Sequence, residues 1–123
     1  MLTRTNRLTS SQSFAHAVRR GRRAGTRTMV LHLAVAREKT ADAPAQVGFV
    51  VSKAVGPAVT RNVVKRRLRH IARQRVLSLP GSAVLVVRAL PAAGSASYPS
   101  LAADFNSALT RLLERGQSAG ASS

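Results

Sequence analysis

The chain has 123 residues, of which 20 are Lys or Arg and four are Asp or Glu, so its formal net charge is +16. This length suits one domain with one hydrophobic core, and the charge favours a polyanionic partner, either nucleic acid or an anionic membrane. The absence of cysteine excludes disulfides, thiolate nucleophiles and cysteine-ligated zinc, and no apolar run approaches membrane-spanning length. These features are typical of a cytoplasmic protein.

The N-terminal half is predicted to form one helix and two strands. Thr9–Gln12 has the pattern of a capping box, so we expect a helix over about 10–20 that ends at Gly21. Alternating residues predict a strand over 28–36, and β-branched residues predict a second over 46–52. Because only a polar loop separates these two strands, we expect them to pair as an antiparallel hairpin.

The C-terminal half is predicted to form two helices around one strand. A basic helix follows Pro57 and ends near residue 76 or 77. Residues 82–88 are apolar nearly throughout, which predicts a strand buried on both faces. A last helix begins near Ser97 and ends at Gly116. Its core-facing residues are Leu101, Phe105, Leu109 and Leu112. We therefore expect a single domain over 1–116 and a disordered tail over 117–123.

The helix after Pro57 separates its charges from its apolar residues. At about 100° per residue, Val64, Leu68 and Ile71 form a core-facing stripe. The other side presents Arg61, Lys65, Arg66, Arg69 and Arg73. A charge run is ordinarily a solvated helix face. Here residues 43–103 contain no Asp or Glu, so like charges four residues apart repel without compensation, which favours binding to the phosphates of RNA or DNA.

A longer motif runs from the second strand into this helix. It reads Val47-Gly48-Phe49-Val50-Val51-Ser52-Lys53, then Val55-Gly56, Ala58-Val59 and Arg61-Asn62, and closes with Lys65-Arg66-Arg67-Leu68-Arg69. Shorter segments accompany it at Arg7-Leu8, Phe14, Arg20-Gly21-Arg22-Arg23 and Ser97-Tyr98. In these residues, and in length and element order, the chain apart from its tail resembles the protein subunit of bacterial ribonuclease P.

The resemblance implies an α+β fold, a two-layer α/β sandwich of the ribosomal-protein S5 domain-2-like type. The residues alone predict the order helix, strand, strand, helix, strand, helix. The resemblance adds a short strand around Arg22–Arg27, where the sequence shows no clear pattern. It also implies a left-handed crossover through the basic helix, whereas the general rule for parallel strands predicts a right-handed one.

The resemblance further implies a role in an endoribonuclease that cuts precursor tRNA at its mature 5′ end. The RNA subunit would perform the hydrolysis, with Mg²⁺ held mainly by that RNA and the substrate. The expected partners are the ribonuclease P RNA and precursor tRNA, with no membrane and no small-molecule substrate. The implied RNA-binding residues are Lys53, Arg61, Asn62, Lys65, Arg66, Arg67, Arg69 and Arg73. The implied cleft for the 5′ leader contains Phe14, Val18, His32 and Ser52.

The chain departs from the family pattern at three positions. Val63 follows Arg61-Asn62 where a third cationic residue is usual, and Arg67 could partly replace it. Val18 and His32 stand where aromatic residues that stack on bases are common, so leader binding is expected to depend more on charge. Phe14 and Val18 are also spaced for ordinary core packing.

The remaining alternatives concern other ways of using a basic helix. The few scattered carboxylates offer no pair that could hold two catalytic metals, so hydrolysis by the chain itself is not expected. A structural RNA-binding protein of the ribosomal type is the main alternative, because its composition and fold class would look alike. A DNA-binding architectural protein lacks a visible helix-turn-helix or zipper. A membrane-surface helix would be expected to carry bulky aromatics in its stripe.

Overall fold

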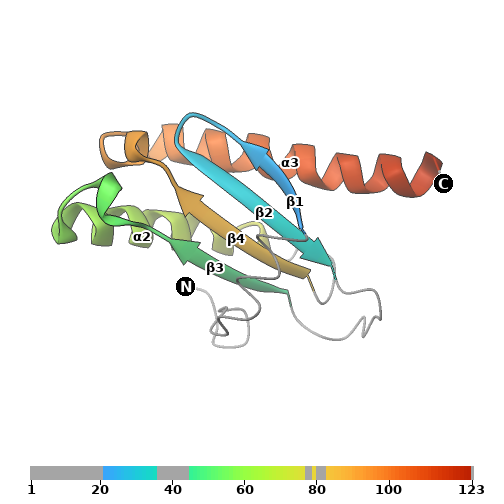
Figure 1. Cartoon of the computed structure of the whole chain (residues 1–123), viewed down its shortest axis with the longest axis horizontal. Coiled ribbons are helices and arrows are strands. Elements are labelled where there is room, and N and C mark those ends of the chain that lie inside the picture. Colours follow the sequence, from blue (N-terminus) through green and yellow to red (C-terminus); the bar gives the residue numbers. More distant parts are fainter. Residues whose placement is uncertain (1–20, 36–44, 77–78, 80–82, 123) are drawn as a thin grey trace.

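The structure, a computed structural model, describes residues 21–35, 45–76, 79 and 83–122. This part of the chain forms a four-stranded sheet, two long helices and two short 3₁₀ helices (Figure 1). The strands are β1 (Arg22–Gly25), β2 (Met29–Val35), β3 (Gln46–Val50) and β4 (Ala83–Ala89). The helices are η2 (Lys53–Val55), α2 (Ala58–Arg73), η4 (Pro91–Gly94) and α3 (Tyr98–Ser122).

The last strand in the sequence lies inside the sheet, whose order is β1-β2-β4-β3. β4 pairs antiparallel with β2 and parallel with β3. The predicted hairpin between strands 28–36 and 46–52 is therefore wrong, because β4 lies between them. The physical reason is the composition of β4, which buries Leu85, Val86 and Val87 and so gains more from a central position than from an edge. Its predicted burial on both faces is confirmed.

Both helices cover the same face of the sheet and build the main core with it (Figure 1). Leu31 and Leu85 point from neighbouring strands into this core, because alternate strand residues share a face. The residues predicted to face the core from the helices are all buried there: Val64, Leu68 and Ile71 of α2, and Leu101, Phe105, Leu109 and Leu112 of α3. The predicted core-facing side of each helix is thus confirmed.

The crossover from β3 through α2 to β4 joins two parallel neighbours. In Figure 1 both helices lie behind the sheet, the two strands run towards the left, and the chain moves upward from β3 to β4. This path is left-handed, as the resemblance implied. The short strand implied around Arg22–Arg27 is also present, as β1.

The two helix ends differ from their predicted positions. α2 ends at Arg73, about three residues earlier than expected, and α3 continues to Ser122 instead of ending at Gly116. A single glycine inside a helix costs only about 1 kcal/mol, and no proline follows it to stop the helix. The helix expected over 10–20 lies outside the described residues. The domain limits 1–116 and 117–123 stay a prediction.

Candidate nucleic-acid interface

The cationic side of α2 points away from the sheet. The buried residues Val64, Leu68, Ile71 and Ala72 fix the rotation of the helix. Opposite them, Asn62, Arg66 and Arg73 are exposed, and Arg61, Lys65 and Arg69 are partly exposed. Because α2 has no acidic residue along its length, its outward face carries positive charge and no negative charge. We call these six outward residues the α2 face.

The start of α2 is fixed by its own backbone. Gly56 adopts a φ of 153°, which side chains other than glycine rarely allow, and Pro57 caps the helix in an extended conformation. The Nε of Arg61 donates a hydrogen bond to the carbonyl oxygen of Gly56 at 3.2 Å. This bond uses one of the five N–H groups of the guanidinium, so Arg61 is held at the helix start while other donors are left for a ligand. The helix dipole adds positive potential there.

Ser52 and Lys53 adjoin this helix start. Ser52 precedes η2 and Lys53 opens it, and both side chains are exposed. The backbone N–H of Gly56 donates to the carbonyl oxygen of Lys53 at 3.1 Å, which ties η2 to the turn before α2. The structure thus places Lys53 beside the cationic end of α2.

The middle of α2 is connected to the segment that leads into α3. The Nη1 of Arg67 donates to the carbonyl oxygen of Ala96 at 3.2 Å. The Nδ1 of His70 lies 2.5 Å from the hydroxyl of Tyr98, with which it shares a hydrogen bond, and the two ring centroids are 5.7 Å apart. Arg67 therefore links two elements, which distinguishes it from the α2 face. No sequence pattern indicated the pairing of His70 with Tyr98.

The second face of the sheet, opposite α2 and α3, carries a different group of side chains. His32 of β2 is 4% exposed, and neither ring nitrogen has a hydrogen-bond partner within the part of the chain that the structure describes. Arg23 of β1 and Val86 of β4 lie directly beside it in the strand register, and Arg88 is the next β4 residue on that face. Burial, together with the charges of Arg23 and Arg88, lowers the pKa of His32 below its ordinary value of 6.5, so the ring is neutral at pH 7.

The residues predicted to share a leader cleft are only partly placed by the structure. His32 lies in the middle of β2, whereas Ser52 lies beyond the end of β3, towards α2. Phe14 and Val18 lie outside the described residues. Sequence reasoning missed Arg23 and Arg88 as site residues, because Arg23 lies in a short strand without a clear pattern and Arg88 is the single charge of an apolar strand. Only the register brings both to His32.

The described acids do not form a metal site. Asp104 accepts a hydrogen bond from the hydroxyl of the buried Thr28 at 2.6 Å, and Glu114 is exposed three turns further along α3. In the described ranges no three His, Asp or Glu residues are grouped closely enough to hold a metal ion. None of the helices in these ranges has the length and apolar character needed to cross a bilayer.

Comparison with known proteins identifies the family. The ribonuclease P family model matches residues 2–113. The ribonuclease P protein component of a Nocardioides species is 60% identical over 112 residues, covering 91% of this chain and 95% of the relative. That of Streptomyces avermitilis is 54% identical over 124 residues, covering 94% and 98%.

Solved structures show the same fold at lower identity. The Staphylococcus aureus RNase P protein is 21% identical, with a TM-score of 0.74 over 85% of this chain and 93% of that one. The Thermotoga maritima protein is 20% identical, with a TM-score of 0.68 over 86% and 94%. The match of the family model over most of the chain, and relatives with more than half of their residues identical, decide the assignment. The chain belongs to the ribonuclease P protein family and acts in that endoribonuclease complex, in tRNA processing.

Proposed function

We propose that the α2 face binds the RNA subunit of ribonuclease P and that the chain thereby positions precursor tRNA for 5′ maturation. The observation that carries this proposal is the fixed orientation of α2, whose buried stripe turns an acid-free row of cations outward. Arg66 and Arg69 lie on this row, and the exposed amide of Asn62 can bond phosphate or sugar. Lys53 extends the same positive surface beyond the helix start.

We place the hydrolytic chemistry in the RNA subunit, with Mg²⁺ bound by that RNA and the substrate. Hydrolysis by two metal ions requires them about 4 Å apart, held by several oxygen ligands. The described carboxylates do not fit such a site, because Asp104 is engaged with Thr28 and Glu114 lies ten residues away. The contribution of this chain is therefore electrostatic and positional. The mixed sheet and left-handed crossover also support the S5 domain-2-like class.

The second face of the sheet is our candidate for the surface that contacts the 5′ leader. Among the described residues the ring nitrogens of His32 have no hydrogen-bond partner, whereas buried polar atoms are normally paired, so we propose that a base or a phosphate of the leader supplies one on binding. Arg23 and Arg88 flank the ring and add positive charge. Phe14 and Val18 are proposed to complete this cleft, with Ser52 near the α2 end. Because His32 replaces a larger aromatic ring, charge rather than stacking supplies most of the contact.

The experiment that tests the α2 face is a charge reversal. Arg66→Glu with Arg69→Glu should abolish binding to the catalytic RNA, because both side chains point outward and like charges then face phosphate. If the unmodified chain neutralises about five phosphates, log K should fall with log salt concentration at a slope of roughly −3.5 to −4.5. Binding is measured by filter retention across salt concentrations, and circular dichroism checks that the variant folds.

A charge-matched control comes from the opposite edge of the sheet. Arg22→Glu with Arg27→Glu lowers the formal net charge by the same four units, from +16 to +12, but leaves α2 unchanged. This control should bind the catalytic RNA within about twofold of the unmodified chain. Normal binding by the α2 variant, or equal losses in both variants, would contradict a localised interface.

A further inference from the structure

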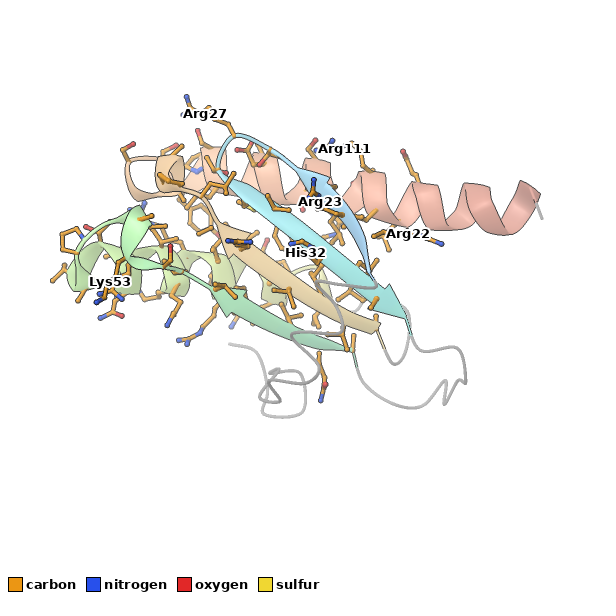
Figure 2. The ribbon with its side chains drawn as sticks, in the orientation of Figure 1. Arg22, Arg23, Arg27, His32, Lys53 and Arg111 are labelled. Carbon is orange, nitrogen blue, oxygen red and sulfur yellow. The ribbon has the colours of Figure 1, made fainter. Side chains whose placement is uncertain are left out.

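A second group of arginines lies along the β1 edge of the sheet. It consists of Arg22, Arg23, Arg27 and Arg111, which we call the β1 rim, and all four side chains are exposed. Figure 2 shows them along the β1 side of the molecule, whereas Lys53 lies at the far end beside η2. The sheet order places β1 and β3 at opposite edges, about 14 Å apart at about 4.8 Å per strand interval. The β1 rim is thus distinct from the α2 face.

The β1 rim presents cations from both layers of the molecule. Arg22 shares a strand face with the buried Ala24 and so points to the side of the helices, whereas Arg23 points to the second face with His32. From α3, the Nη2 of Arg111 donates to the carbonyl oxygen of Gly25 at 2.8 Å, which fixes this guanidinium against the end of β1. A polyanion that passes over this edge would therefore meet positive charge on either side.

The turn after β1 adds Arg27 to the β1 rim. The backbone N–H of Thr26 donates to the carbonyl oxygen of Met29 at 2.8 Å, which closes the turn and leaves Arg27 exposed at its tip. From Arg22 to Arg27 the chain covers at most about 17 Å. Two carboxylates lie on the neighbouring helix: Asp104 is engaged with Thr28, and Glu114 is one turn beyond Arg111. Counted over the described residues alone, the rim has four cations and two neighbouring acids, one of which is already bonded, so it carries a positive charge.

Protection of the sheet edge explains only part of this group. Charged residues on an edge strand prevent pairing with another chain, which would account for Arg22 and Arg23. It does not account for Arg27, which lies in the turn, or for Arg111, which comes from a helix. The extra cations at the same edge indicate a ligand with regularly spaced negative charge, and a phosphodiester backbone has that chemistry.

We propose that the β1 rim binds the backbone of the distal 5′ leader of precursor tRNA, beyond the nucleotides held near His32. This inference rests on the proposed function of the second face. Its support is continuity: Arg23 lies directly beside His32 in the register and also belongs to the rim, so one single strand can cross both surfaces. Because the rim offers guanidinium groups at an exposed edge, it contacts phosphates and adds affinity without base preference.

The test compares leader lengths in the assembled holoenzyme. Arg22→Glu with Arg27→Glu should weaken binding of a precursor tRNA with a leader of about fifteen nucleotides by roughly 5- to 20-fold. Binding of a precursor with a leader of about four nucleotides, and of mature tRNA, should change by less than about twofold. Loss of two contacts should also flatten the salt slope for the long leader by about 1.4. Arg22→Lys with Arg27→Lys keeps the charge and should bind as the unmodified protein does.

Three outcomes would overturn the inference. Equal weakening for both precursors and mature tRNA, or loss of catalytic RNA binding, would assign the rim to another RNA contact. If the variant binds every RNA normally but self-associates, the role of the β1 rim is protection of the sheet edge. Unchanged binding of every RNA by a variant that does not self-associate would also reject the inference. Failure of the proposed cleft is distinguishable, because the unmodified holoenzyme would then bind the short-leader precursor no better than mature tRNA.

Discussion

His32 is a buried imidazole in a setting that opposes its protonation. Its pKa is lowered by burial and by Arg23 and Arg88, so between the lowered value and 6.5 the unfolded chain binds more protons than the folded chain. The contribution of His32 to the free energy of unfolding is therefore complete above pH 6.5 and is lost as the pH falls below it. Urea unfolding at pH 7.5 and pH 5.5 should show lower stability at the acidic pH.

Two variants separate this effect from general acid sensitivity. His32→Phe retains a ring of similar size but does not titrate, so its stability should depend less on pH than that of the unmodified chain. His70→Gln removes a histidine that is exposed and bonded to Tyr98, and should keep the pH dependence that arises at His32. An unchanged pH dependence in His32→Phe would contradict the assignment.

Gly94 is a second residue whose identity is set by its surroundings. A Cβ at this position would lie 2.4 Å from the carbonyl oxygen of Val55, so η2 and η4 can approach each other only without a side chain. Gly94→Ala should cost about 1–3 kcal/mol of stability, because a backbone segment must shift. Gly25→Ala is the control, since its Cβ would meet Val30 at an ordinary 3.7 Å. Thermal melting of both variants checks the difference, and equal melting temperatures would reject it.

Among the elements, α2 couples the core to the cationic surface. Leu68 of α2 is fully buried in the core. Leu68→Ala should lower the free energy of unfolding by about 2–5 kcal/mol, depending on how far the core collapses around the cavity. Val59 on the same helix is 76% exposed, so Val59→Ala should change stability by no more than about 0.5 kcal/mol. Denaturant titration gives both values. If Leu68→Ala lowered the stability by much less than this, the buried stripe of Val64, Leu68 and Ile71 would not anchor α2.

The sequence predicts elements and faces better than it predicts neighbours. The 3.6-residue period of Val64, Leu68 and Ile71 identified both the helix and its buried side, and with them the outward cations. The hairpin prediction failed because the alternation in 28–36 and the β-branched residues in 46–52 indicate two strands but not the partner of either. The apolar composition of β4 was the available signal, since a strand with two apolar faces favours a central position in the sheet.

The candidate site residues also differ in how far the sequence predicts them. Arg61, Lys65, Arg66 and Arg69 lie on one helix, where local spacing alone places them together. The group around His32 draws on β1, β2 and β4, so it exists only through the register of three strands. The resemblance to a family identified His32 as a site residue, but Arg23 and Arg88 became neighbours of that ring only in the folded sheet.

At the scale of the whole molecule, positive charge is gathered on separate surfaces rather than spread evenly. The α2 face lies on the side of β3 and β4, and the β1 rim lies at the opposite edge of the sheet (Figures 1 and 2). The helix α3 supports the second of these through Arg111, and it also bonds Thr28 through Asp104. A small protein with two such surfaces can contact two RNA segments at once, and the second contact is then favoured by proximity.

The central place of β4 also has a consequence for biosynthesis. Until β4 has been synthesised from residue 83 onward, β2 and β3 lack the strand that joins them in the folded sheet, so the edges that β4 will occupy have no partner. Synthesis proceeds at about 5–20 residues per second, so the incomplete chain persists for several seconds in this form. The sheet can close only late in translation, when β4 emerges. Until then the many cations of the nascent chain keep it from self-association by mutual repulsion.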